Sequence, residues 1–289
     1  MNETHHQKTV VVLGADGFVG TEVFRHFQNK SYSVFGTSRH GKQHLFFDAN
    51  NLKESSVHLD DIPKGAYIVN CIGSLKRENA DSKYLEQMNY TNALFPHLLY
   101  DLCKDHFWKF IHISSDAVFQ PNNDVCIETT ATDAIEPYGR SKALGEIHES
   151  SALTIRTSFL GRDSAHQKGL LEWALHNTAS QIDGYSNQQW TGCTTPQFAQ
   201  FCEYLIQGGF DSLTKMTNVV HFVPIQKTTK FDILLTWLKL HPHINTKVKE
   251  TTAIPITRKL DTLYKDFFTE IHLYNTNLET ALRELKEDL

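Results

Sequence analysis

The sequence predicts an α/β fold: a doubly wound parallel sheet with helices on both faces, followed by a smaller, mainly helical region. Three observations lead to this prediction. Short apolar runs alternate with amphipathic stretches over the first 160 residues. The first run ends in a glycine-rich turn that opens a helix. After Gly161 the alternation gives way to mostly helical stretches. Alternating strands and helices are typical of parallel sheets, because each parallel connection needs a crossover.

The strands of the first part are short runs rich in apolar residues, the composition of buried parallel strands. They are expected at Thr9–Leu13, Tyr32–Gly36, His44–Asp48, Ala66–Gly73, Phe110–Ser114 and Leu153–Arg156. The intervening helices are expected over Phe18–Asn29, Leu85–Lys104 and Tyr138–Ser150.

The second part is expected to begin at residue 161, which gives a domain over 1–160 and a region over 161–289 that partly returns to the sheet. Helices are expected over Gly169–His176, Phe231–Leu240 and Asn277–Glu287. Another should start at Thr195-Pro196, with the threonine as its N-cap and the proline in its first turn. The polar stretch Gly184–Gly192 is expected to be a loop.

Composition excludes several classes of protein. The 28 basic and 33 acidic residues give a net charge of −5, which argues against nucleic acid as a partner. The apolar run Thr9–Leu13 is too short for a signal peptide or a membrane span. Five cysteines without CxxC spacing indicate reduced thiols in a cytoplasmic protein. The sixteen histidines form no HExxH motif, and no metal site is predicted.

The turn after the first strand has the spacing of a dinucleotide-binding loop. Gly14 permits a backbone shape that a Cβ hinders, Gly17 lets the backbone approach a pyrophosphate, and Gly20 allows close packing of the helix on the sheet. The free N–H groups of the helix start can then bind phosphate. The turn is therefore predicted to bind a dinucleotide, and residues 1–160 to be the cofactor-binding domain. Asp16, Phe18 and Val19 are assigned to the cofactor as well.

The end of the second strand favours NADP(H) over NAD(H). A carboxylate there would bind a ribose 2′-hydroxyl, but the chain reads Gly36-Thr37-Ser38-Arg39-His40. Thr37 and Ser38 can donate to a phosphate, and Arg39 can pair with it or stack on adenine. The alternative is that Arg39 is a solvated loop residue.

A tyrosine and a lysine lie one helical turn apart in YGRSKALG, at Tyr138 and Lys142. A positive charge beside a phenol favours its ionisation, which brings an otherwise weak acid closer to neutral pH. Ser115, at the end of the fifth strand, can bind a substrate oxygen. These three residues are predicted to be catalytic, with Tyr138 protonating a carbonyl while a nicotinamide supplies hydride.

Taken together, the glycine turn, the strand-end Ser-Ser pair and the Tyr-x-x-x-Lys helix resemble the extended short-chain dehydrogenase/reductase superfamily. The segments FIHISSDAVF, EPYGRSKALGE and LTIRTSFLG resemble dTDP-4-dehydrorhamnose reductases and related nucleotide-sugar reductases. The resemblance implies a Rossmann-like sheet and NADPH-dependent reduction of a keto nucleotide-sugar, for bacterial surface polysaccharide biosynthesis. It also implies that residues 161–289 bind the substrate.

The resemblance assigns further residues. Tyr138 and Lys142 belong to the cofactor site as well as to the catalytic set. The other residues that it places at the cofactor are Asp48, Cys71, Gly73 and Asn89, the last expected to support the active-site helix. Asp116, Phe159 and Thr195 are candidate substrate contacts. Ala117 and Phe159 replace a tyrosine and a tryptophan of the rhamnose-pathway enzymes, so the sugar can differ. Glu22 aligns with a metal-associated glutamate of some members.

Two alternatives remain open from the sequence. One is a nucleotide-sugar epimerase, although Ser38-Arg39 stands where an NAD-binding acid is expected. The other is a regulatory subunit of the same fold that binds NADP without turnover, although Ser115, Tyr138 and Lys142 are all present. Dehydration is disfavoured because Asp116-Ala117 lacks the glutamate of the sugar dehydratases. A homodimer is a common outcome in the superfamily.

Overall fold

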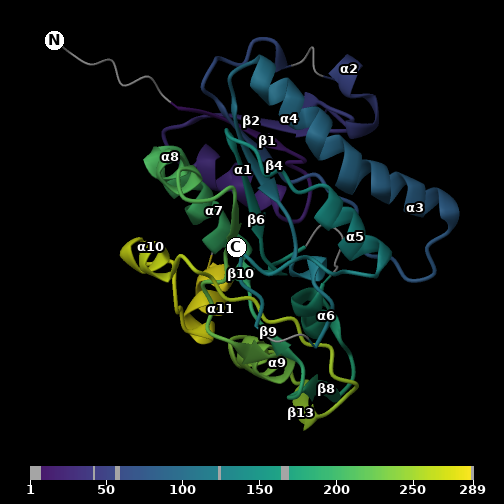
Figure 1. The fold of residues 1–289 in the computed structure, drawn as a ribbon. Coiled ribbons are helices and arrows are strands. Elements are labelled where there is room, and N and C mark those ends of the chain that lie inside the picture. Colours follow the sequence, from purple (N-terminus) through teal and green to yellow (C-terminus); the bar gives the residue numbers. More distant parts are fainter. Residues whose placement is uncertain (1–7, 42, 56–58, 123–124, 164–168, 288–289) are drawn as a thin grey trace. The chain divides into compact units, whose positions relative to one another are not determined.

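The computed structural model describes residues 8–41, 43–55, 59–122, 125–163 and 169–287 (Figure 1). The chain forms two compact units that interleave along the sequence. The first unit comprises Met1–Ser114, Glu136–Ile155 and Ala199–Val219, and the second comprises Ser115–Ile135, Arg156–Phe198 and Val220–Leu289. The domain boundary predicted at residue 160 stays a prediction. It differs from this division because 115–135 groups with the second unit and 199–219 with the first.

A seven-stranded sheet has the order β11-β6-β5-β4-β1-β2-β3. Its strands are β1 (Thr9–Leu13), β2 (Ser33–Ser38), β3 (Leu45–Phe46), β4 (Tyr67–Asn70), β5 (Lys109–Ile113), β6 (Ala152–Arg156) and β11 (Val219–His221). The pairs from β3 through β2, β1, β4 and β5 to β6 are parallel. The chain runs from β1 outward to β3 and then returns to β4 on the other side of β1. This reversal is the doubly wound pattern that the sequence predicts.

Helices cover both faces of this sheet. Ile68 of β4 belongs to a hydrophobic cluster with residues of α4 (Phe95–Asp105). Its neighbour Tyr67 meets the ring of Phe210 edge-on at 5.8 Å between ring centroids, at the start of α8 (Phe210–Thr214). Successive strand residues point to opposite faces, so α4 and α8 lie on opposite sides of the sheet. The burial of every residue of β1 follows from this double cover.

The first crossover helix, α1 (Gly20–Gln28), buries Val23 and Phe27 and leaves its other faces more polar. The predicted helix over Leu85–Lys104 is also present, but it is not uniform. It consists of α3 (Ser82–Asn89), a π-helical turn and α4. The wider π turn, Tyr90–Leu94, adds a residue to the repeat and rotates the following side chains relative to an ideal helix.

Short helical segments complete the first unit and its connections. They are η1 (Ala49–Asn51), α2 (Leu52–Ser55), α5 (Pro137–Leu144) and the π turn η5 (Leu205–Gly209). The predicted helix over Tyr138–Ser150 is too long, because α5 ends at Leu144 and Gly145 is its C-cap.

In the residues that the structure describes, the second unit holds three two-stranded sheets. The parallel pairs are β7 (Phe159–Leu160) with β10 (Cys193–Thr194) and β8 (Gln181–Tyr185) with β13 (Lys247–Thr251). The antiparallel pair is β9 (Gln189–Trp190) with β12 (Thr228–Thr229). The prediction of a loop over Gly184–Gly192 is therefore wrong, since the segment contains the end of β8 and all of β9.

The second unit has helices and a buried core of its own. Its helices are η4 (Asp116–Val118), α6 (Leu170–His176), α9 (Lys230–Lys239), α10 (Lys265–Glu270) and α11 (Leu278–Glu287). Trp237 of α9, Leu171 of α6 and Leu282 of α11 meet in one buried cluster. Trp237 also donates its indole N–H to the Leu171 carbonyl at 3.2 Å, which satisfies the polar atom of a buried ring.

The helix expected to begin at Thr195-Pro196 is α7 (Thr195–Tyr204), but its cap lies one residue earlier. The Gln197 amide donates to Thr194 Oγ1 at 3.3 Å, and the Thr194 amide donates to Gln197 Oε1 at 3.0 Å. This reciprocal pair is a capping box. Within the described part of the chain, no helix combines the length and apolar character needed to cross a membrane.

Candidate active site

The glycine turn of the first unit is held by the second strand. Gly14 has a φ of +76°, which suits glycine, and its amide donates to Thr37 Oγ1 at 3.3 Å. The Gly17 amide donates to the Gly14 carbonyl at 2.9 Å. A Cβ on Gly20 would lie 2.1 Å from the Gly14 oxygen, so the first residue of α1 must be glycine. The turn is therefore closed tightly under the start of α1, with Phe18 and Val19 forming its last part.

An exposed cation follows directly after β2. Arg39 is exposed, and the preceding Ser38 accepts hydrogen bonds from the amides of His40 and Gly41 at 3.2 and 3.1 Å. Thr37 is fully buried and holds the glycine turn, so the expectation that it donates to a ligand phosphate is wrong. Asp48, the next acid along the chain, caps η1 by accepting from the Asn50 amide at 3.1 Å.

A histidine that sequence reasoning missed lies against this turn. His44 Nε2 is 3.3 Å from the Asp16 carboxylate, and the ring meets Phe24 of α1 edge-on at 4.6 Å. A Cβ on Gly36 would lie 2.4 Å from His44 Nδ1, so the imidazole covers β2 where the strand has no side chain. The one signal for this contact was a glycine inside an apolar strand, which often marks a close approach.

The active-site helix is tied to the loop after β4 by Asn92. Its side chain accepts from the Ser74 amide at 2.8 Å and donates to the Ser74 carbonyl at 2.9 Å and to Ser141 Oγ at 3.1 Å. Asn92 is 1% exposed, whereas Asn89 is exposed. The supporting role expected of Asn89 is therefore performed by Asn92, which lies in the π turn. Cys71 and Gly73 lie on the same strand-end segment, and burial raises the pKa of the Cys71 thiol to about 12.

Tyr138 and Lys142 lie one turn apart on α5, whose first residue is Pro137. Proline suits this position because its missing N–H has no partner in the first turn. Lys142 is 5% exposed, and its ammonium donates to the Ile113 carbonyl of β5 at 2.6 Å. Burial lowers the pKa of Lys142 to about 8, and the Glu146 carboxylate partly opposes this shift. The helix thus carries a buried ammonium group at the end of a sheet strand.

A pocket of about 310 Å³ in the first unit reaches Tyr138. Tyr84, Leu85 and Met88 of α3 supply apolar lining, and the loop before α3 supplies Lys76 and Arg77. Sequence reasoning assigned no role to these residues. The available signal was their place after β4, because ligands of parallel sheets bind beyond the carboxyl ends of strands.

Two cations at this pocket already have partners, Lys76 and Arg77. Lys76 forms an ion pair with Glu136 at 2.9 Å, between two side chains that are both exposed. The Arg77 guanidinium lies over the Tyr84 ring, 5.3 Å from its centroid. Such exposed pairs are weak, so a ligand can displace them at little cost.

Ser115 begins the second unit as the N-cap of η4. Its hydroxyl accepts from the Ala117 amide and donates to the Asp116 carboxylate, both at 3.1 Å. Burial raises the pKa of the Asp116 carboxyl, and the positive charge of Arg258 opposes that shift. Ser115 therefore has a fixed orientation, and a ligand oxygen that takes its proton must compete with Asp116.

The other candidate substrate residues are largely enclosed. Phe159 of β7 meets Phe198 edge-on at 5.2 Å, and Thr195 is buried at the start of α7. For Glu22, the aligned metal-associated position, the structure shows an ion pair with Arg25 at 2.8 Å. Among the described residues, no group of three or more His, Cys, Asp or Glu could hold a metal ion.

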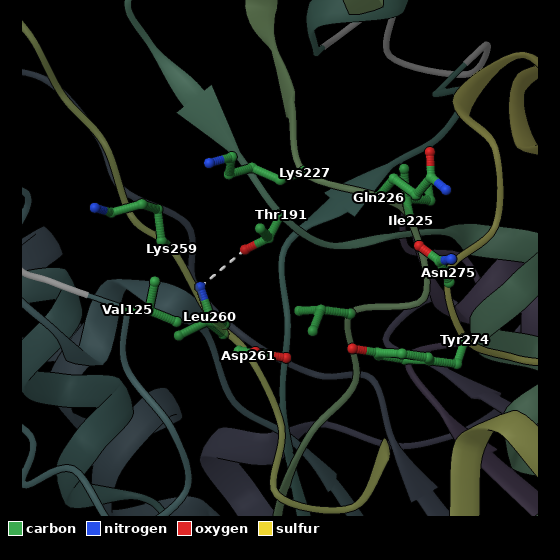
Figure 2. A pocket seen from close by; sticks show the side chains of 11 residues that line it. Val125, Thr191, Ile225, Gln226, Lys227, Lys259, Leu260, Asp261, Tyr274 and Asn275 are labelled. Atoms are coloured by element: carbon green, nitrogen blue, oxygen red, sulfur yellow. Dashed lines mark hydrogen bonds between the residues drawn. The ribbon is translucent and has the colours of Figure 1, made fainter. Parts of the chain in front are cut away.

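The second unit has a pocket of about 210 Å³ that no sequence pattern indicated (Figure 2). Its wall includes a hydrogen bond from the Leu260 amide to Thr191 Oγ1 at 3.0 Å. The side chains of Lys227 and Lys259 extend toward the same side of the pocket in Figure 2. Asp261, two residues after Lys259, also lines the pocket.

A doubly wound parallel sheet, a glycine turn after its first strand and a Tyr-x-x-x-Lys helix beside the fifth define an extended short-chain dehydrogenase/reductase. This class is the one that the sequence predicted. Within it, the chain belongs to the family of the RmlD substrate binding domain, whose model matches residues 8–260.

Solved structures agree with this assignment at the level of fold. The dTDP-4-dehydrorhamnose reductase of Bacillus anthracis, solved in complex with NADP, superposes with a TM-score of 0.80. The comparison covers 98% of this chain and 100% of that protein at 16% sequence identity.

Two curated proteins match parts of the chain. A probable low-salt glycan biosynthesis reductase, Agl14 of Haloferax volcanii, is 29% identical over 183 residues, which are 58% of this chain and 60% of the relative. The methionine adenosyltransferase 2 subunit beta of Danio rerio is 28% identical over 141 residues, 48% of this chain and 42% of the relative. The chain thus matches about three fifths of one curated relative's length and about two fifths of the other's.

Proposed function

We propose that this protein reduces a keto group of a nucleotide-sugar with NADPH, giving a deoxysugar nucleotide for surface polysaccharide biosynthesis. One observation carries the proposal: Lys142 is buried one turn after Tyr138, at the carboxyl end of β5, with its pKa lowered to about 8. A structural lysine would not be desolvated at this position without a reason, because burying an ammonium group is costly. Family membership and the glycan biosynthesis reductase among the relatives support the same activity.

The residues present fit a dinucleotide. The glycine turn leaves no room for a Cβ at Gly20, and a Cβ on Gly17 would lie 3.1 Å from the Gly14 oxygen, so bare backbone faces the start of α1. Asp16 would contribute its backbone, because its carboxylate pairs with His44. The similar Bacillus anthracis structure contains NADP, which supports the choice of a nicotinamide cofactor.

NADP(H) rather than NAD(H) is proposed because of the charge after β2. Arg39 is exposed there, and no carboxylate stands at the end of the strand to bind a 2′-hydroxyl. Ser38 would orient the turn by its bonds to the amides of His40 and Gly41. Asp48, Cys71, Gly73 and Asn89 stay proposed members of the wider cofactor site.

In the proposed mechanism, a bound NADPH supplies hydride to the substrate carbonyl carbon. Tyr138 donates its phenolic proton to the carbonyl oxygen, so that the carbonyl becomes an alcohol and the tyrosine is left as a phenolate. Lys142 stabilises that phenolate by its positive charge and holds the cofactor ribose. Ser115 donates a hydrogen bond to the same oxygen before the proton moves. Asp116, Phe159 and Thr195 are proposed to contact the sugar.

A second candidate is a non-catalytic subunit that binds NADP. The match to a protein named as the beta subunit of methionine adenosyltransferase 2 favours it. The intact set of Ser115, Tyr138 and Lys142 favours an enzyme instead, because a subunit without turnover has no need of a tyrosine that donates a proton or of a serine that binds the carbonyl oxygen. The cytoplasmic location and the homodimer predicted from the sequence belong to the enzymatic proposal.

Loss of NADPH fluorescence on mixing with a panel of nucleotide 4-keto-sugars tests the proposal. We expect turnover with at least one sugar, and Tyr138→Phe should lower kcat by roughly 10²–10⁴-fold while NADPH still binds. The phenylalanine keeps the ring and removes the proton, so folding should be unchanged. Tight NADPH binding without oxidation on any sugar would support the subunit instead.

A further inference from the structure

The chain turns sharply inward after the active-site helix, at a place where only glycine fits. A Cβ on Gly145 would lie 1.9 Å from the Asn92 carbonyl oxygen, so the end of α5 is pressed against the π turn. The next residue, Glu146, is 4% exposed, although glutamate is almost never buried without a partner. The first unit thus places a carboxylate inside the protein directly behind the active-site helix.

The buried carboxylate has a specific partner. Ser114 donates its hydroxyl proton to Glu146 Oε1 at 2.6 Å, and both side chains are buried. His148 Nε2 lies 3.8 Å from Glu146 Oε2, but its side chain is 61% exposed. Ser114 therefore has a structural role of its own, because its hydrogen bond fixes the orientation of the buried Glu146 side chain.

Lys142 shares this interior. Its ammonium donates to the carbonyl of Ile113 at 2.6 Å, and Ile113 directly precedes Ser114, whose hydroxyl holds the Glu146 carboxylate. His112 lies on the same strand and is fully buried, with its Nδ1 3.1 Å from the Asn70 amide nitrogen. Burial, together with the charges of Lys142 and His97, holds the pKa of His112 well below its ordinary value, so this imidazole is neutral. Glu146 supplies the negative charge that favours the charged form of Lys142.

We propose that Glu146 is a positioning residue that keeps Lys142 protonated and in place, with Ser114 holding the carboxylate in the required orientation. The proposal rests on the proposed function, because it gives Lys142 its role at the tyrosine and the cofactor. Glu146 itself touches neither substrate nor cofactor in this scheme. It acts through the lysine.

The sign of the effect follows from the charges. Burial lowers the pKa of Lys142 to about 8, and Glu146 raises it against that trend. Removing the negative charge lowers the pKa further, so the ammonium is lost at a lower pH. Every property that needs charged Lys142 should then decline earlier as the solution becomes more alkaline, and nothing should change well below that range.

Glu146→Gln is the sharp test, because the amide oxygen can still accept the Ser114 hydroxyl and only the charge is removed. NADPH affinity is measured as a function of pH by cofactor fluorescence, without any sugar. We expect the pH at which affinity falls on the alkaline side to be lower than in the wild type by roughly one pH unit. The alkaline limb of kcat should move in the same direction. Glu149→Gln is the matched control, since it removes an exposed carboxylate three residues further on and should leave both profiles unchanged.

Two further variants separate charge from packing. Glu146→Asp keeps the charge and should retain most of the original pH profile even if its stability falls. Ser114→Ala removes the hydrogen bond to the carboxylate and should shift the alkaline limb less than Glu146→Gln does.

Identical pH profiles for wild type and Glu146→Gln would overturn the inference while leaving the reductase proposal intact. A wild-type protein that never binds NADPH would instead contradict the proposed function.

Discussion

A buried ammonium group one helical turn after a tyrosine separates Lys142 from the many surface lysines that match the same spacing by chance. Its pKa of about 8 and its bond to the Ile113 carbonyl are properties of the fold. The sequence predicted the pair from its chemistry, and Ser115 from its place at a strand end. The sequence did not reveal that Glu146 is buried, because a glutamate that follows a helix is ordinarily expected to be exposed to solvent.

In the proposed function, the choice of NADPH over NADH depends on Arg39. Arg39→Ala should weaken NADPH binding by roughly 10- to 100-fold, the effect of losing a charge-assisted hydrogen bond, and should leave NADH binding unchanged. Fluorescence titration with both cofactors measures this. Arg25→Ala, on α1 and paired with Glu22, is the control and should change neither affinity. Equal losses for the two cofactors would contradict a role at the 2′-phosphate.

At the scale of elements, strands with strong local signals were predicted closely. Thr9–Leu13 is β1 to the residue, because an apolar run ended by glycine fixes both its type and its end. β8 and β13 were missed because their sequences, QIDGY and KVKET, are polar. Each strand exists through its hydrogen bonds to the other, which lies more than sixty residues away in the sequence. Pairing over that distance leaves no local pattern.

The π turn explains why the sequence did not single out Asn92 as the asparagine that holds the active-site helix. A regular helix over Leu85–Lys104 does not tell which asparagine of NYTN faces the active-site helix. The structure widens the helix at Tyr90–Leu94, and Asn92 turns inward while Asn89 stays exposed. Sequence periodicity assumes a constant repeat, so a π turn defeats it.

Asn92 and Asn89 offer a matched pair for this element. Asn92→Ala should lower the free energy of unfolding by roughly 2–3 kcal/mol, because Ser74 and Ser141 lose buried partners. Asn89→Ala, with the same chemistry on an exposed surface, should change it by less than about 0.5 kcal/mol. Urea denaturation measures both. Equal effects would mean that the loop after β4 is not held to α5 through Asn92.

At the scale of the whole molecule, the site is maintained at a cost in stability. Lys142 is protonated in the unfolded chain up to its ordinary pKa of 10.5, but only up to about 8 when folded. Below pH 8 both states carry the proton, so the full cost of burying the charge is present. Between about 8 and 10.5 the folded state releases its proton first, and the cost disappears as pH rises.

Lys142→Met should therefore be more stable than wild type at pH 7, by roughly 1–3 kcal/mol, although it should lose activity. The difference should shrink between pH 8 and 10.5, since the wild type no longer buries a charge there. Urea denaturation of both proteins across this range is the measurement. A difference that stays constant with pH would show that the lysine is not desolvated in the folded state.

The fold class of the whole chain was predicted from the sequence, whereas the domain boundary at residue 160 stays a prediction. The doubly wound sheet follows from element order alone, whereas the grouping of 115–135 and 199–219 depends on contacts that no local pattern encodes. The same limit applies to the pocket beside Tyr138, whose lining comes from the loop after β4 and from α3 as well as from α5.

Transfer of deuterium to a nucleotide 4-keto-sugar from NADPH that carries deuterium at both C4 positions tests the reduction most directly, because the label follows the hydride itself whichever face of the nicotinamide is used. With wild-type protein we expect one deuterium on the former carbonyl carbon of the product for each NADPH oxidised, and none with Tyr138→Phe on the same timescale. Product without deuterium, or a cofactor that binds tightly and is never oxidised by any sugar of the panel, would contradict the reductase.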